Sequence, residues 1–163
     1  EYVQQLMEFD KKFLIIGNLN SVSYKEIFKL FQNNKIWMGK TIHSGDREFR
    51  VPNSYPLDAS GYRVDANGVK YIRVKGVRWF TNMDVSIRHE LLLNRLKLSE
   101  IELIKYADYD AIDINKVCDI PDDYMGVMGV PITFLDVYNP DQFEILGCHE
   151  PCIDLAVIKK SKK

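Results

Sequence analysis

The feature that most constrains this fold is the alternation of helix and strand patterns over the first forty residues. Residues 2–9 have the spacing of an amphipathic helix, and the apolar run 13–16 predicts a buried strand. Ser23 and Glu26 stand three apart, as in a capping box, and open a second stretch of helical apolar spacing. Residues 36–39 predict a following strand. This order of helix, strand, helix and strand is typical of an α/β fold with a mostly parallel sheet.

The composition fits one globular domain. The chain has 163 residues, of which 46% are hydrophobic and 28% are charged. A chain of this size and composition buries a substantial core, which excludes collagen, coiled coil and wholesale disorder. No apolar run approaches the roughly 18 residues that a membrane-spanning helix needs, so we expect no membrane partner.

Cysteine usage and the first residues indicate the setting of the chain. The three cysteines are an odd number in a sequence without a secretory leader, which argues against a disulfide framework and for a reducing compartment. We therefore expect a cytoplasmic protein. The sequence starts at Glu1 inside a helical pattern that lacks a convincing N-cap, so we also expect it to be a piece of a longer protein.

Charge is divided unevenly along the chain. Residues 1–82 contain 13 Lys and Arg against 8 Asp and Glu, whereas residues 83–163 contain 9 against 15. The two halves therefore have net charges of +5 and −6. The split indicates that the first half tolerates or seeks an anionic partner and that the second half does not.

The middle of the chain combines a loop with a basic strand. Residues 40–68 contain Gly, Pro and Asn at intervals that break any long element, so they predict a long functional loop or a small insertion. Residues 69–75 then alternate in the manner of a strand, which places Tyr71, Arg73 and Lys75 on one face. This strand therefore presents a basic face.

The later chain predicts fewer regular elements. Residues 87–98 have apolar spacing that suggests a helix. Beyond them the pattern breaks into short elements and turns, so residues 99–163 predict a loop-rich region.

Several short motifs fail on inspection. The triplet 39–41 resembles the end of a phosphate-binding loop, but no Gly-rich turn precedes it. His89 has no second histidine at position 93, where a helical zinc-protease motif needs one. Cys118 and the cluster 148–152 offer soft ligands, but their spacing does not fit a zinc site. We therefore expect no metal.

One cluster has chemical promise for nucleic acids. Cations on a strand face suit phosphates, an aromatic ring at a strand end can stack on an exposed base, and an Asn side chain can pair with a base edge. The alternative is that the aromatic residues are simply core. The cluster comprises Arg73, Lys75, Arg78, Trp79, Phe80 and Asn82.

Long ordered blocks of the sequence resemble the adenine-specific DNA methyltransferases of the EcoRI modification-methylase type. The resemblance covers most of the chain and is far more specific than any short pattern. The blocks are residues 13–20, 24–28, 34–39, 77–82, 109–112, 115–117, 119–121, 125–135 and 138–147.

The resemblance implies transfer of a methyl group from S-adenosylmethionine to N6 of an adenine that is flipped out of duplex DNA. In that family a catalytic Asn-Pro-Pro-aromatic motif follows a strand, and a Gly-rich turn binds the cofactor further upstream. Neither is present here, since the nearest look-alike, residues 139–142, departs from the motif and stands too late in the chain. The resemblance thus implies a C-terminal portion without catalytic residues of its own, whose partners are duplex DNA and a missing N-terminal half.

The same resemblance implies a fold and its divisions. The expected class is α/β, the C-terminal part of a Rossmann-like methyltransferase sheet plus a loop-rich target-recognition region. Residues 1–98 correspond to the end of the catalytic domain, with a basic insertion at about 40–68. Residues 99–163 correspond to a target-recognition or packing region.

Site residues follow from the resemblance and from the charge pattern. Trp79 or Phe80 is the candidate that stacks on the flipped adenine, and Asn82 continues that segment. Asn18 and Asn20 are expected on the same rim, although turn formation is the slightly favoured explanation for them. The candidate contacts to the DNA backbone are Lys40, Arg47, Arg50, Arg73, Lys75 and Arg78.

Two alternatives stay open at this point. The chain could be a non-catalytic DNA-binding or specificity module that never had a catalytic half. RNA could replace DNA as the substrate, because a basic face with aromatic residues permits either.

Overall fold

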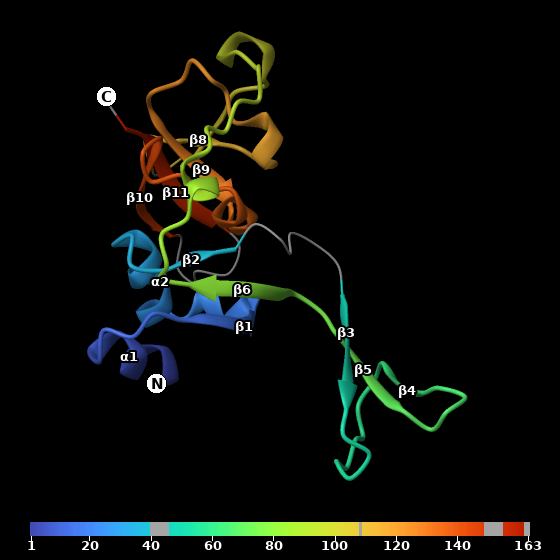
Figure 1. The fold of residues 1–163 in the computed structure, drawn as a ribbon. Helices are drawn as coiled ribbons and strands as arrows, with labels where there is room; N and C mark the ends of the chain where they lie inside the picture. Colours follow the sequence, from blue (N-terminus) through green and yellow to red (C-terminus); the bar gives the residue numbers. More distant parts are fainter. Residues whose placement is uncertain (40–45, 108, 149–154, 162–163) are drawn as a thin grey trace.

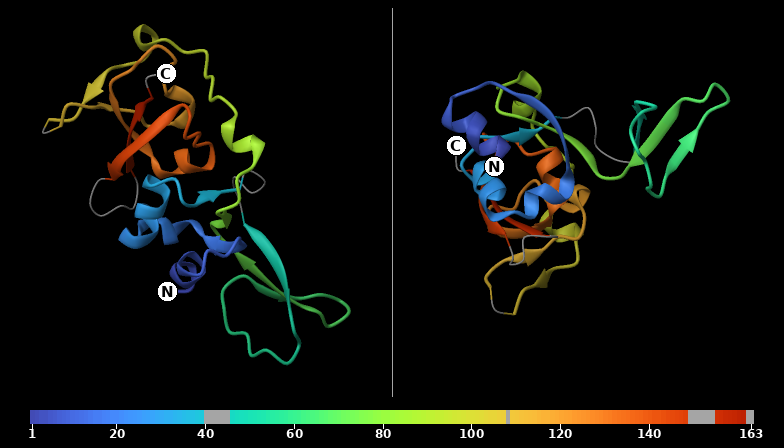
Figure 2. Two further views of the ribbon diagram at one scale, coloured as in Figure 1. Left: turned by 60° about the vertical axis from the view of Figure 1, so that its left-hand side comes forward. Right: turned by 90° about the horizontal axis from the view of Figure 1, so that it is seen from below.

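The computed structural model describes residues 1–39, 46–107, 109–148 and 155–161. Three small sheets organise these residues (Figure 1). Two of them lie in the body of the molecule, and the third forms an arm that projects from it (Figure 2).

The predicted order of elements in the first forty residues is confirmed. Two α-helices alternate with two strands, and a 3₁₀ helix, η1, leads into the second helix. The elements are α1 (Tyr2–Glu8), β1 (Leu14–Asn18), η1 (Leu19–Ser23), α2 (Lys25–Gln32) and β2 (Trp37–Met38).

The first sheet has the order β1-β6-β2, with β6 (Val77–Thr81) in the middle. Both neighbours pair with β6 in the antiparallel sense, so that Leu14 lies opposite Thr81 and Ile16 opposite Trp79. The expectation of a mostly parallel sheet is therefore wrong for the part of the chain that the structure describes. The reason is that the central partner of β1 comes from beyond the insertion and runs back along it.

One face of this sheet packs on α2. Phe80 is 4% exposed, and its ring meets that of Phe31 edge to face at a centroid distance of 6.2 Å. Gly17 makes this possible, because a Cβ atom at Gly17 would lie 2.9 Å from the Phe80 ring. A bulky residue on β1 at this position would displace a core aromatic side chain.

The arm is a three-stranded antiparallel sheet of order β3-β5-β4. Its strands are β3 (Arg47–Val51), β4 (Tyr62–Val64) and β5 (Lys70–Val74). It leaves the body between β2 and β6 and extends away from both other sheets (Figures 1 and 2). The insertion predicted at about 40–68 therefore extends to β5, because the alternating strand 69–75 belongs to the same sheet.

The second sheet of the body has the order β10-β11-β9-β8-β7. Its pairings are antiparallel except for that of β8 with β9, which is parallel. Its strands are β7 (Ile104–Lys105), β8 (Ile112–Asp113), β9 (Val127–Pro131), β10 (Phe143–Cys148) and β11 (Leu155–Lys160). The 3₁₀ helix η3 (Leu98–Glu100) precedes β7, and the 3₁₀ helices η4 (Val117–Asp119) and η5 (Ile132–Asp136) lie between the strands.

A buried ion pair joins the two sheets of the body. Arg78 on β6 donates from Nε and Nη2 to the two carboxylate oxygens of Asp136 at the end of η5, at 2.8 and 3.1 Å. Arg78 is 4% exposed and Asp136 is 6% exposed. Because both charges are desolvated, this pair fixes the position of one sheet against the other.

The helix predicted over residues 87–98 does not form. A 3₁₀ helix, η2 (Ser86–His89), ends at once, and an extended segment follows. Side chains from the second half of the chain form hydrogen bonds with the backbone of this segment. Gln142 bonds both the N–H and the C=O of Leu92, and Asp122 accepts the N–H of Arg95. These tertiary hydrogen bonds replace those that a helix would supply.

A histidine bridge ties η2 to the turn before β10. His89 lies between Asp84 and Asp141, with Nε2 at 2.9 Å from one carboxylate and Nδ1 at 2.6 Å from the other. The hydrogen bonds to Asp84 and then to Asp141 raise the pKa of His89 above its usual 6.5. The bridge therefore favours the protonated, doubly donating imidazole.

This bridge predicts a pH dependence of stability. Since the pKa is raised in the folded state, the contribution is complete below the unfolded pKa of about 6.5 and disappears as pH rises through the folded pKa. We expect His89→Gln to lower the urea midpoint clearly at pH 5.5 and much less at pH 9. Equal losses at the two pH values, measured by urea unfolding, would show that the charge of His89 plays no part.

Two further findings concern the setting of the chain. In the described parts of the chain, no helix is long and apolar enough to cross a bilayer. Cys118 is free and exposed, whereas Cys148 at the end of β10 is disulfide-bonded. The disulfide at Cys148 departs from the expectation that a disulfide framework is unlikely, and the rest of the cluster 148–152 lies outside the described residues.

Candidate nucleic-acid interface

The arm has two chemically different faces. The pairing places Arg50 on β3 and Arg63 on β4 directly opposite Tyr71 on β5. Because side chains alternate across a strand, the three share one face with Arg73 and Lys75. We call this the cationic arm face, and it comprises Arg50, Arg63, Tyr71, Arg73, Lys75 and Glu48.

The other face of the arm is largely apolar. Its members are partly exposed, because no second layer covers a three-stranded sheet that projects from the body. Tyr62 and Val64 on β4 are 37% and 50% exposed. The apolar arm face comprises Phe49, Val51, Tyr62, Val64, Ile72 and Val74, and the cations Arg47 and Lys70 lie on the same side of the sheet.

Two ion pairs organise the cationic arm face. Arg63 donates to Glu48 from Nε at 2.7 Å and from Nη2 at 2.5 Å, and its guanidinium lies 4.4 Å from the centre of the Tyr71 ring. The hydrogen bond with Arg63 lowers the pKa of Glu48, and the same bond raises the pKa of Arg63. Arg73 Nε lies 2.7 Å from Asp46.

The remaining cations of this face have no carboxylate partner in the described parts of the chain. Arg50 and Lys75 are both exposed. Cationic side chains that are exposed on one face of a projecting sheet suit an extended anionic surface, because each can meet a different phosphate.

The turn between β4 and β5 holds the arm in shape. The carboxylate of Asp65 accepts the N–H groups of Asn67 and Val69, both at 2.9 Å. These two hydrogen bonds lower the pKa of Asp65, and the bond from Val69 has the larger effect. Gly68 in the same turn has φ +77°, a conformation that glycine adopts at little cost.

The structure separates the six residues predicted to contact the DNA backbone. Arg50, Arg73 and Lys75 share the cationic arm face, as the alternation of 69–75 predicts for the last two. Arg47 lies on the opposite face of β3, and Lys40 lies outside the described residues.

Arg78 is wrongly predicted as a contact to the DNA backbone. Its side chain is buried and bonded to Asp136, so it belongs to the joint between the sheets. The sequence shows only a cation next to an aromatic residue on a strand, and the partner comes from a position 58 residues later.

Three residues of the face have no counterpart among the predicted site residues: Arg63, Glu48 and Tyr71. The sequence does not mark Arg63 and Glu48, because they lie in a stretch where turn residues obscure the strand pattern. The alternation of residues 62–64 is a signal too short to separate from a loop. Only the pairing of β4 with β5 places Arg63 beside Tyr71.

The predicted adenine-pocket residues do not form one rim. Because β1 and β6 are antiparallel, Asn82 lies beyond the start of β1, whereas Asn18 and Asn20 lie at its end. Asn82 accepts the N–H of Phe13 at 3.0 Å and donates to the carbonyl of Lys11 at 2.8 Å. Asn82 therefore fixes the backbone just before the first residue of β1.

Asn18 anchors the base of the arm. Its side chain accepts the N–H of Asn20 and donates to the carbonyl of Lys75, both at 2.9 Å. Next to it, the N–H of Leu19 bonds the carbonyl of Gly76, which has φ +65°. The turn-forming explanation that was open for this residue is thus the one that the contacts support.

The two aromatic candidates differ in exposure. Phe80 is in the core against Phe31, which takes it out of the candidate pocket. Trp79 is partly exposed and lies opposite Ile16 on the other face of the sheet. Trp79 is therefore the aromatic residue of β6 that can meet a ligand.

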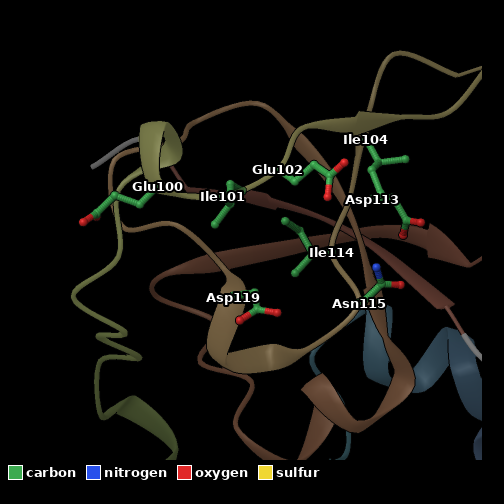
Figure 3. Close-up of a pocket in the computed structure, with 8 residues that line it drawn as sticks. All are labelled: Glu100, Ile101, Glu102, Ile104, Asp113, Ile114, Asn115 and Asp119. Atoms are coloured by element: carbon green, nitrogen blue, oxygen red, sulfur yellow. The ribbon is translucent and has the colours of Figure 1, made fainter.

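An acidic hollow lies in the second half (Figure 3). Asp113 accepts the hydroxyl of Tyr106 at 2.7 Å, and burial together with this bond raises the pKa of Tyr106 to about 12. The described residues contain no group of three or more His, Cys, Asp or Glu that could hold a metal. Carboxylates repel phosphates, so the hollow does not fit the DNA backbone. It is lined by Glu100, Ile101, Glu102, Ile104, Asp113, Ile114, Asn115 and Asp119.

Comparison with known proteins defines the class. The family described as "Adenine-specific methyltransferase EcoRI" matches residues 1–163. The chain belongs to this family, and the resemblance seen in the sequence is confirmed.

Two individual relatives of the chain are Type II methyltransferases. The chain is 51% identical over 148 residues to the Type II methyltransferase M.EcoRI of Escherichia coli, a match that covers 90% of this chain and 45% of that protein. It is 38% identical over 152 residues to the Type II methyltransferase M.MpnI of Mycoplasma pneumoniae, covering 91% and 47% respectively. The chain therefore spans about half the length of these relatives. No solved structure matches it.

Proposed function

We propose that this chain is the C-terminal, DNA-contacting portion of a site-specific DNA adenine N6-methyltransferase of a restriction-modification system. The observation that supports it best is the arm, which gathers Arg50, Arg73 and Lys75 on one face of a sheet that projects from the body. A methyltransferase that modifies adenine within a defined DNA sequence needs such a surface, because phosphate contacts position the enzyme on the duplex.

The first sheet of the body supports a division of the protein into two halves. In the described residues, β1 pairs with β6 on one edge and has no strand on the other. Leu14 and Ile16 on β1 are 53% and 48% exposed. A preceding half of the same polypeptide that pairs with this edge and also packs on this face would cover both side chains and build the Rossmann-like sheet. The length of the relatives leaves room for that half.

The proposed division of labour follows from what this chain contains. S-adenosylmethionine, when bound, supplies the methyl group, but the described residues include no Gly-rich turn of the kind that binds it, so we assign no residue of this chain to the cofactor. The polarising Asn-Pro-Pro-aromatic motif is also missing from the sequence. What the chain contributes is the cationic arm face and, at Trp79, a stacking surface for the flipped adenine.

The domain roles stay close to those expected from the sequence. Residues 1–98 end the catalytic domain and carry the arm as its insertion. In residues 99–163 several acidic side chains bond backbone or side-chain groups of the same chain, as Asp122 and Asp136 do. This region therefore acts in packing. A cytoplasmic location stays a prediction.

The test is transfer of labelled methyl groups from S-adenosylmethionine to duplex DNA, with the modified base identified by mass. We expect the natural full-length protein to form N6-methyladenine and residues 1–163 alone to form none, because the polarising groups are missing. Turnover by residues 1–163 alone would contradict this assignment. DNA binding without transfer by the full-length protein would favour the alternative, a non-catalytic specificity module, and transfer to RNA alone would exclude DNA as substrate.

A further inference from the structure

Two contacts hold the Arg63 side chain in place. On one edge of its guanidinium, Nε and Nη2 both bond the carboxylate of Glu48. Below it lies the Tyr71 ring, 4.4 Å from the guanidinium carbon. The side chain thereby reaches across β5 from β4 to β3, and the two contacts restrict a side chain that would otherwise sample many rotamers.

The second edge of this guanidinium is not used. Arginine has five N–H donors in a fixed plane, of which Glu48 occupies one from Nε and one from Nη2. In the described residues neither Nη1 nor the other N–H of Nη2 donates a hydrogen bond, and the side chain is 51% exposed. The free edge presents two parallel N–H donors. This geometry matches the two acceptors of a guanine, O6 and N7.

We propose that Arg63 is a specificity-determining residue that reads one guanine in the major groove, with Glu48 and Tyr71 as its positioning residues. The inference rests on the proposed function, because it takes duplex DNA as the partner. It deepens that function by separating one base reader from the phosphate contacts of the same face.

The position of Arg63 on the arm fits this role. It lies on β4, one of the two outer strands of the arm, and the β4–β5 hairpin forms that edge of the three-stranded sheet. The major groove of B-DNA, about 12 Å wide, admits a two-stranded β-ribbon. By contrast, Arg50 and Lys75 have no partner that would fix their side chains in the described parts of the chain, as suits contacts to phosphates at no set angle.

The experiment uses the natural full-length protein and a library of duplexes randomised over the recognition site. Methylated molecules and, in parallel, bound molecules are sequenced. We expect Arg63→Ala to lower discrimination at one G·C pair by about 5- to 150-fold, the range for loss of one bidentate base contact, with the other positions unchanged. Arg63→Lys keeps the charge but has no fork, so we expect the same relaxation with non-specific affinity retained.

Two matched variants separate this role from simpler ones. Glu48→Gln keeps the shape of the positioning side chain but not its charge, so we expect a smaller relaxation at the same G·C pair. Arg50→Ala removes the same charge from the same face, and we expect it to weaken binding to all sequences alike and to reduce the salt slope by about 1.

The outcomes are distinct. Unchanged preferences in Arg63→Ala, or a loss of affinity that is uniform across sequences, would overturn the role of Arg63 as a base reader. If the wild-type protein methylates nothing, the proposed function fails on that result alone. The bound fraction of the library then still decides whether Arg63 reads a base.

Discussion

Replacing Arg50, Arg73 and Lys75 together by alanine is expected to remove most of the contribution of the arm to DNA binding. Each cation that neutralises a phosphate adds about 0.9 to the slope of log affinity against log salt concentration, so the triple variant should lose a slope of nearly 3. Because this term vanishes near 1 M salt, a slope loss of that size corresponds to roughly 100-fold weaker binding at physiological salt. The measurement is the affinity of the full-length protein for one duplex at several salt concentrations.

A matched control removes the same charge elsewhere. Lys25 and Lys29 on α2 and Lys116 before η4 are exposed and lie away from the arm. Replacing these three by alanine should leave the salt slope unchanged. If both triple variants lose the same slope, binding reflects overall charge and the cationic arm face has no special place in it.

Asp136→Ala is expected to destabilise the fold by about 3–5 kcal/mol, the range for breaking a buried ion pair. The reason is that Arg78, 4% exposed, keeps its charge in the interior without its carboxylate partner. This loss is a large fraction of the stability of an ordinary domain. Urea unfolding of wild type and variant measures it.

Two further variants test the cause of that loss. Asp110→Ala removes an exposed carboxylate from the same half and should change the unfolding midpoint little. Arg78→Met with Asp136→Val replaces both charges by apolar groups of similar combined volume and should recover most of the loss. A double variant as unstable as Asp136→Ala would show that shape, and not charge burial, explains the effect.

Local patterns predict the elements whose determinants are local. The helix and strand order of the first forty residues and the faces of β5 follow from apolar spacing, and the structure has both. The helix over 87–98 fails for a non-local reason, because Gln142 and Asp122 supply the backbone of that segment with partners from more than 25 residues away. The direction of β6 is non-local too, since the arm separates it from β2.

The candidate site also depends on non-local contacts that the sequence does not reveal. Arg73 and Lys75 are found by strand alternation, but the sequence cannot tell the exposed Arg73 from the buried Arg78 five residues later. That difference depends on Asp136, whose approach is set by the packing of η5 on the first sheet. In the same way, Glu48 and Arg63 become one unit only through the pairing of both outer strands with β5.

The proposed function makes the arm the DNA-contacting element of this protein. Hydrogen exchange of the full-length protein, with and without a duplex that contains its recognition site, tests the claim most directly. Bound DNA is predicted to slow amide exchange in residues 47–51, 62–64 and 70–74 of the arm and to leave the second sheet, residues 104–160, largely unchanged. Slower exchange in the second sheet with no change in the arm would contradict the claim.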